Sequence, residues 1–149
     1  MSRAAVGSVA LVLVLGACGS GVLVDAYPRE DGTQELCDML LADLPAEVAG
    51  NDRREVAQDV PAAAWGEVPI ILRCGVERPE ELTASSRCDM VADVGWFEEE
   101  TADGRVFTTI GRDAYVSVEV PGQVQPAADV LVDLADSVVK HVPQDQPCV

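Results

Sequence analysis

The chain has 149 residues, with 26 acidic and 10 basic side chains and a net charge of −16 at pH 7. This length suits one domain with a buried core. The acidity excludes nucleic-acid binding through phosphate neutralisation, which needs clustered Lys and Arg. An anionic membrane surface would also repel the chain, so any membrane attachment must come from a lipid or an apolar segment. The simplest consequence of the charge is solubility.

The N-terminus predicts an export signal. Arg3 precedes an apolar run from Ala4 to Leu15, which is the arrangement of a positive n-region and an h-region. The run closes with Leu15-Gly16-Ala17-Cys18, which resembles the lipobox of bacterial lipoproteins, where the cysteine is acylated and becomes the first mature residue. The resemblance implies a signal peptide over residues 1–17 and a palmitate-type lipid on Cys18.

Two alternatives to lipidation stay open. Residues 4–24 carry no charge over 21 positions and nearly suffice to span a bilayer as an uncleaved anchor. Simple secretion is the other alternative, although bulky Leu15 stands where ordinary signal cleavage needs a small residue. Lipidation would give more than one acyl chain and therefore stable attachment. The predicted location is the extracytoplasmic face of the cell membrane.

Four cysteines remain beyond Cys18, an even number that predicts two disulfides in an oxidising compartment. We expect Cys74–Cys88, because these residues would lie at the ends of neighbouring antiparallel strands, and Cys37–Cys148, which would tie the first helix to the tail. Cys37–Cys74 with Cys88–Cys148 stays open, because Cys37 and Cys74 both face the core. No C-x-x-C spacing occurs, so no metal site is predicted.

The predicted elements begin with a tether over residues 18–32, in which 22–26 is a candidate first strand. A helix should start near Asp31, which stands at capping-box spacing from Gln34, and should end at Pro45. Its apolar residues recur at helical spacing: Leu36, Leu40, Leu41 and Leu44.

Residues 47–64 show no clear period, and from Trp65 the pattern becomes β. Four apolar or alternating runs predict antiparallel strands over 69–76, 90–97, 106–110 and 114–120. Asp103-Gly104 predicts a hairpin between the second and third runs. A closing helix should begin at Pro126, with an apolar stripe from Val130 to Val139.

These elements together predict a single α+β domain over residues 33–149. We expect a two-layer sandwich, in which an antiparallel sheet of about four strands carries an N-terminal and a C-terminal helix on one face. The other face would be solvated or would meet a partner. It would carry Arg73, Asp93, Thr109, Ser117 and Glu119.

Several motifs resemble those of an actinobacterial family of small exported proteins of unknown function. They are Ala62-Ala63-Ala64-Trp65-Gly66, Pro69-Ile70-Ile71-Leu72-Arg73-Cys74-Gly75-Val76, Pro79, Cys37 before Leu44-Pro45, Trp96, Phe107 to Arg112, and Pro147-Cys148. The similarity extends over nearly all of the mature chain, and Val68 replaces a usual second proline. The resemblance implies the fold and the compartment and brings no activity with it.

The sequence offers little for catalysis. A nucleophile needs an oriented base beside it, yet His141 is the only histidine and stands at a predicted helix end. Acids are too numerous for any pair to indicate a glycosidase. The acidic run 98–100 with Asp103 fits a charged hairpin end better than a calcium loop. We expect no catalytic residue, no metal and no cofactor.

Trp65, Arg73 and Arg112 form the candidate partner surface, because a Trp beside an Arg on an open face suits protein recognition. The alternative places Trp65 at the core edge, pairs Arg73 across strands with Asp93 or Glu119, and gives Arg112 local bonds in a turn.

The predicted function is non-catalytic binding of an envelope protein or cell-wall component by a lipid-anchored domain, with no nucleic-acid partner. A small envelope hydrolase and a structural envelope protein are the alternatives.

Overall fold

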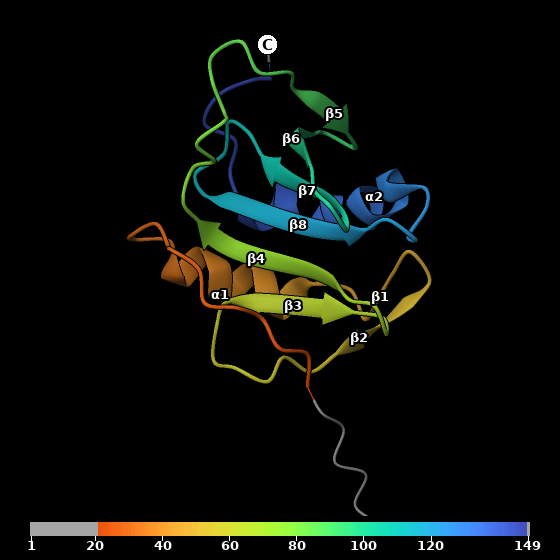
Figure 1. Cartoon of the computed structure of the whole chain (residues 1–149). Coiled ribbons are helices and arrows are strands. Elements are labelled where there is room, and N and C mark those ends of the chain that lie inside the picture. The colour runs from red at the N-terminus through yellow and green to blue at the C-terminus, as the bar shows by residue number, and fades with distance from the viewer. Residues whose placement is uncertain (1–20, 149) are drawn as a thin grey trace, which may run out of the picture.

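The computed structural model describes residues 21–148 (Figure 1). Helix α1 (Gln34–Asp43) precedes eight strands, and helix α2 (Ala127–His141) follows them. The strands are β1 (Glu47–Val48), β2 (Asn51–Arg54), β3 (Ala62–Trp65), β4 (Ile70–Val76), β5 (Asp89–Val91), β6 (Val94–Glu100), β7 (Gly104–Thr109) and β8 (Tyr115–Pro121). The predicted signal peptide and the predicted lipidation of Cys18 lie outside the described residues.

The eight strands form one antiparallel sheet in the order β1-β2-β3-β4-β8-β7-β6-β5. Both helices lie behind this sheet in Figure 1. The α+β class and the packing of both helices on the sheet are therefore confirmed, and the expectation of about four strands is wrong.

The sequence pattern does not predict the additional strands, for two reasons. Strands β1, β2 and β3 have only two to four residues each, too few to show a period of two. The predicted run 90–97 is divided into β5 and β6 by a turn at Ala92 and Asp93, whose φ angles are 44° and 65°. Asp93 therefore lies in a turn, and its expected place on the open sheet face is wrong.

Thr109 is also misplaced by the sequence prediction. Its side chain is fully buried on the helix-covered side, where its hydroxyl donates to the carbonyl of Ala114 at 3.3 Å and accepts from the amide of Val116 at 2.9 Å. The hydroxyl satisfies backbone groups where β7 turns into β8, so a polar residue is tolerated in the core.

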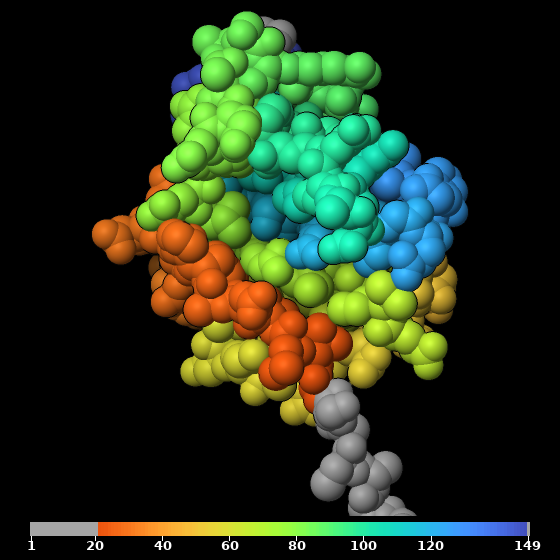
Figure 2. Space-filling view, in the orientation of Figure 1, coloured from red at the N-terminus to blue at the C-terminus, as the bar shows by residue number. Residues whose placement is uncertain are grey.

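The N-terminal segment 21–31 packs against the sheet and is not a free tether. It runs along the front of the sheet in Figure 2, opposite the helices. The candidate strand over 22–26 does not form, and isolated bridges occur only at Val22–Val56 and Arg29–Val76 within this segment. Val24 is 1% exposed, and the Tyr27 hydroxyl donates to backbone carbonyls of Pro61 and Cys74, both at 3.0 Å.

The first helix ends as predicted, with Leu44 as its C-cap before Pro45. Its start differs, because Thr33 is the N-cap and makes no capping bond with its side chain. The Thr33 hydroxyl instead donates to the carbonyl of Glu30 at 2.9 Å. The expected box between Asp31 and Gln34 is thus out of register with the helix start.

The core lies between the sheet and the helices, as the alternating pattern predicts. The inward residues of β4 and β8 are buried, and so is the apolar stripe of α2: Ile70, Leu72, Cys74, Val116, Val118, Val120, Val130, Leu131, Leu134, Ala135 and Val138. Two fully buried tryptophans complete it. The Trp65 Nε1 group donates to the Pro45 carbonyl at 3.0 Å, whereas Trp96 Nε1 has no hydrogen-bond partner among residues 21–148.

The disulfides correct the favoured pairing. The structure joins Cys37 to Cys74 and Cys88 to Cys148, with Cα atoms 5.6 and 5.9 Å apart, which is the alternative that the sequence left open. Cys74 lies in β4 and Cys88 precedes β5, and three strands separate β4 from β5 in the sheet. The two strands are therefore not neighbours, and helix α1 brings Cys37 onto β4 instead.

Candidate functional site

The first residue of the predicted partner surface, Trp65, is fully buried and cannot contact a partner. The Arg53 guanidinium covers its ring at 5.8 Å from the centroid and donates to the carbonyls of Leu41 and Leu44, each at 3.1 Å. Burial lowers the pKa of Arg53. The alternative prediction, that Trp65 lies at the edge of the core, is confirmed. The contact between Arg53 and Trp65 was not predicted, because the polar sequence of β2 gives no sign of it.

Arg73 lies on the front of β4, but its charge is matched within the protein. Its Nη1 atom is 3.0 Å from Glu119 Oε2 on the neighbouring strand β8, and its side chain is 18% exposed. The predicted cross-strand pair with Glu119 is confirmed. Since the guanidinium already has a carboxylate partner, Arg73 is a weak candidate for recognising another molecule.

Arg112 joins distant parts of the chain. Its guanidinium donates to the carbonyl of Val142 at 2.6 Å and to that of Asp93 at 2.9 Å, so the predicted bonding within a local turn is wrong. Burial lowers the pKa of Arg112, and the negative charge of Asp93 partly opposes this effect. Arg112 therefore fixes the tail after α2 to the β5–β6 turn, and it also lines a cavity described below.

His141 belongs to a polar contact between the ends of the two helices. Its Nε2 atom is 3.0 Å from Asp43 Oδ2, and Lys140 Nζ is 2.9 Å from the same oxygen. These two groups hold the pKa of Asp43 below its usual range. Ser137 donates its hydroxyl to the backbone carbonyl of Asp43 at 2.9 Å. The contact thus attaches α1 to α2, and this structural role explains the position of His141 without a catalytic role.

A cavity of about 410 Å³ lies at the end of the molecule that carries the C-terminus. We call it the pole pocket, and its lining includes Arg78, Leu82, Ser86, Ile110, Arg112 and Tyr115. The disulfide Cys88–Cys148 also lines it. The volume is within the range of about 300–1,000 Å³ that is usual for small-molecule sites.

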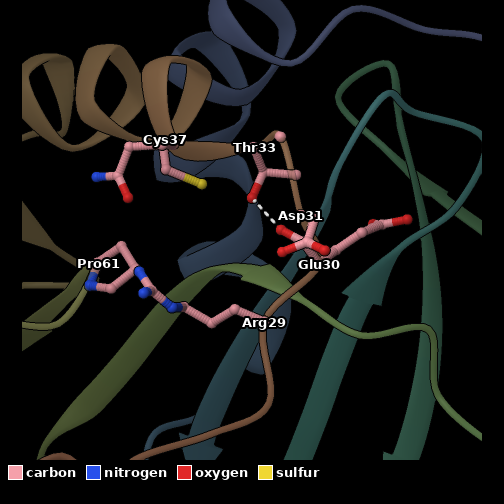
Figure 3. Close-up of a pocket in the computed structure, with 8 residues that line it drawn as sticks. Arg29, Glu30, Asp31, Thr33, Cys37 and Pro61 are labelled. Atoms are coloured by element: carbon pink, nitrogen blue, oxygen red, sulfur yellow. Dashed lines mark hydrogen bonds between the residues drawn. The ribbon is translucent and has the colours of Figure 1, made fainter.

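A second cavity, shown in Figure 3, lies beside the disulfide Cys37–Cys74. Arg29, Thr33 and Pro61 line it, and its volume is about 120 Å³. That volume is well below the lower limit of about 300 Å³ for ordinary ligand sites. The amide of Glu30 donates to the Gly75 carbonyl at 2.9 Å here, so the cavity marks where the N-terminal segment packs on β4.

The acidic hairpin has partners of its own. Glu98 on β6 is 3.2 Å from Arg105 on β7. Burial raises the pKa of Glu99, and the negative charge of Glu81 acts in the same direction. Within residues 21–148, no group of three or more His, Cys, Asp or Glu side chains is placed to hold a metal ion. In the same part of the chain, no helix has the length and apolar character needed to cross a membrane.

Of the predicted surface, the structure therefore brings only Arg112 into a cavity. Arg78, Leu82 and Tyr115 complete that cavity, and sequence reasoning missed them. Residues 77–88 show neither a helical nor a strand period, so the position of this loop depends on the far strand β5 and on the disulfide that follows it.

Fold and disulfides define an α+β domain of the kind found outside the cytoplasm, because disulfides persist in oxidising compartments. The chain belongs to the family described as "Protein of unknown function (DUF3515)", whose model matches residues 4–147. The expected membership in a family of unknown function is thereby confirmed. No curated protein and no solved structure matches the chain.

Proposed function

We propose that this protein is a lipid-anchored domain on the extracytoplasmic face of the membrane, which binds a protein or cell-wall component of the envelope without catalysing a reaction. The two disulfides support the compartment. The apolar run ending at Cys18 supports the anchor. The net charge of −16 disfavours attachment to anionic lipids by electrostatics, so the attachment we propose is the acyl group on Cys18.

The observation that carries the proposal is the short stretch of chain between Cys18 and Val22, which is already hydrogen-bonded to the domain. The Val22 amide donates to the Glu55 carbonyl at 2.7 Å, and the Ala57 amide donates to the Val22 carbonyl at 2.9 Å. Four positions separate Cys18 from Val22, and an extended chain covers at most about 14 Å over that interval. An acylated Cys18 would therefore hold the β2 end of the domain close to the bilayer.

The same geometry gives the domain an orientation. The N-terminal segment enters at one end of the molecule in Figure 1, and β5 and the C-terminus lie at the opposite end. With the β2 end against the lipid, the pole pocket would face away from the membrane. A domain presented in this way is suited to meeting a partner in the space outside.

The positions of the polar residues favour binding over hydrolysis. A hydrolase needs a nucleophile, a base and an orienting group in one cleft. Here His141 contacts Asp43 at the helix ends, Arg73 pairs with Glu119 on the sheet front, and Arg112 holds the tail. These groups belong to separate structural contacts, which supports the binding role.

The test is mass spectrometry of the protein purified from the membrane fraction of its native host. We expect an N-terminal peptide that begins at an acylated Cys18. Cys18→Ala should abolish acylation and release or mislocalise the protein, whereas Ser20→Ala, a matched small substitution two positions on, should change neither. An unmodified Cys18 or an intact N-terminus containing Arg3 would contradict the anchor.

A further inference from the structure

We infer that the pole pocket binds a small organic carboxylate, an inference that names the ligand chemistry for the binding role proposed above. The pocket lies between two walls, the loop 77–88 after β4 and the tail 143–148 after α2. Its floor is the connection 110–114 between β7 and β8, together with Tyr115 at the start of β8. A carboxylate that also carries a short apolar group matches this lining, for the following reasons.

The walls are fixed in place, so the cavity is formed before any ligand arrives. The disulfide Cys88–Cys148 links one wall to the other. The amides of Asp145 and Gln146 both donate to the Gly111 carbonyl, at 2.8 and 3.0 Å. Gly111 has a φ of +68°, and a Cβ there would overlap the backbone oxygen of Gln146. A preformed site loses little entropy when it binds a ligand.

The charge of the pocket is opposite to that of the protein as a whole. Acidic side chains outnumber basic ones 26 to 10 in the chain, yet the lining of the pocket contains Arg78 and Arg112 against one carboxylate, that of Asp145. Within residues 21–148, neither guanidinium is in a salt bridge. The negative charge of Asp93, outside the lining, acts on Arg112 without forming a salt bridge, so two guanidinium groups face the cavity with one lining carboxylate, a balance that favours an anionic ligand.

Both guanidinium groups are oriented by the backbone and keep donors to spare. Arg112 donates to the carbonyls of Val142 and Asp93, and Arg78 donates to the carbonyl of Leu82. A guanidinium has five N–H donors in a planar fork, so these bonds occupy only some of them. Two such bonds hold the fork of Arg112 and one holds that of Arg78, and a planar fork with free donors suits recognition of a carboxylate.

The remaining lining residues favour a carboxylate that carries an apolar group over a bare inorganic anion. Leu82 is 7% exposed and packs at one wall, and Ile110 lies on the floor. The hydroxyl of Tyr115 adds a neutral donor, whereas the Ser86 hydroxyl donates to the Glu81 carbonyl and accepts from the Thr83 amide within its own loop. Apolar walls with a few oriented polar groups are the usual composition of a small-molecule site.

The test is an NMR titration of the protein as purified from its host in detergent micelles, whether or not Cys18 is acylated, with N-acetyl-leucine as the probe. The amide of the same compound is the neutral control, and inorganic phosphate tests for a bare anion. We expect saturable shifts at residues 110–115 with the carboxylate, and binding of the amide weaker by about tenfold or more, since charge-assisted hydrogen bonds are lost. Inorganic phosphate should bind more weakly than the carboxylate.

Two variants distinguish the pocket from general charge attraction. Arg78→Gln should weaken carboxylate binding by about tenfold, whereas Arg105→Gln, which removes an equal charge outside the pocket, should leave the affinity unchanged. Where Arg78→Gln disturbs its loop, Tyr115→Phe removes one hydroxyl at constant shape and should weaken binding severalfold.

The inference is overturned by the absence of saturable shifts, by equal binding of the carboxylate and the amide, by tighter binding of phosphate, or by equal effects of Arg78→Gln and Arg105→Gln. It is also overturned if both pocket variants bind as the parent protein does. Because the titration depends on the pocket alone, its failure would leave acylation of Cys18 as a separate question.

Discussion

Removing each disulfide separately should destabilise the domain to different extents. In the chain-entropy model, closing loops with sequence separations of 37 and 60 residues stabilises the folded state by about 3.8 and 4.3 kcal/mol at 25 °C. Loop entropy alone therefore predicts that Cys88–Cys148 contributes slightly more. The surroundings of the two disulfides reverse this order.

Cys37 and Cys74 are both buried in the core, at 1% and 0% exposure, whereas Cys88 and Cys148 are only partly buried. The double variant Cys37→Ala with Cys74→Ala also leaves a cavity, which adds about 1–2 kcal/mol. Its total cost is then about 5–6 kcal/mol, against about 4 kcal/mol for the double alanine variant at Cys88 and Cys148. The first loss equals much or all of the stability of an ordinary domain, about 5–15 kcal/mol.

The assay is urea unfolding followed by the fluorescence of the two buried tryptophans. We expect the Cys88/Cys148 variant to unfold cooperatively at a reduced urea midpoint, and the Cys37/Cys74 variant to unfold at a much lower midpoint or to be unfolded without urea. A greater loss of stability in the Cys88/Cys148 variant would refute the reasoning. Non-reducing peptide mapping checks the pairing itself and should recover Cys37 linked to Cys74.

Three further variants test individual contacts. Trp65→Phe should cost about 1 kcal/mol more free energy of unfolding than Trp96→Phe, because among residues 21–148 the Trp65 indole donates a hydrogen bond, to Pro45, and the Trp96 indole does not; equal losses in urea unfolding would contradict this. Glu99→Gln should raise the melting temperature at pH 7, because burial raises the pKa of Glu99, so that its ionised form destabilises the fold as pH rises. The gain should vanish in acid, once Glu99 is protonated in the parent protein. A lower melting temperature of the Glu99→Gln variant at pH 7 would contradict the burial of Glu99 as the cause of its raised pKa. Asp43→Asn should lower the melting temperature at neutral pH, because the lowered pKa of Asp43 means that its ionised form stabilises the fold. The difference between the variant and the parent protein should shrink as acid protonates Asp43. Thermal scans in which this difference does not depend on pH would exclude the ion pair.

The sequence was sufficient to predict the long, regular elements and the core. The alternation of Val116, Val118 and Val120 with polar residues placed one face of β8 inward, and the apolar stripe of α2 has the period of a buried helix face. The hairpin at Asp103-Gly104 is present between β6 and β7. In these elements, local pattern and tertiary packing require the same residues.

The sheet order could not be read from the sequence, and two errors follow from that. Strands consecutive in the chain are usually neighbours, but β4 pairs with β8, and β5 lies at the far edge. The pairing of Cys74 with Cys88 assumed that consecutive strands were adjacent. The expected surface at Trp65 assumed that this residue lies beside an open sheet face, whereas Trp65 is fully buried and is covered by β2 and Arg53.

The pole pocket depends on the same long-range arrangement. Its two arginines are 34 positions apart, and neither stands in a motif that indicates a ligand. They come together only because the tail crosses Gly111 and joins Cys88. A site built from a loop, a turn and a tail has no periodic signal, so only the assembled fold reveals it.

The most direct test of the proposed anchor and orientation measures which end of the domain lies at the membrane. The lipid-anchored protein would be placed in nanodiscs that contain gadolinium-chelating lipids, and the paramagnetic broadening of each backbone amide would be recorded. We predict strong broadening at residues 55–59, next to the point where Val22 joins the fold, and little at residues 88–91, at the opposite end. Equal broadening at the two ends, or stronger broadening at residues 88–91, would contradict the account.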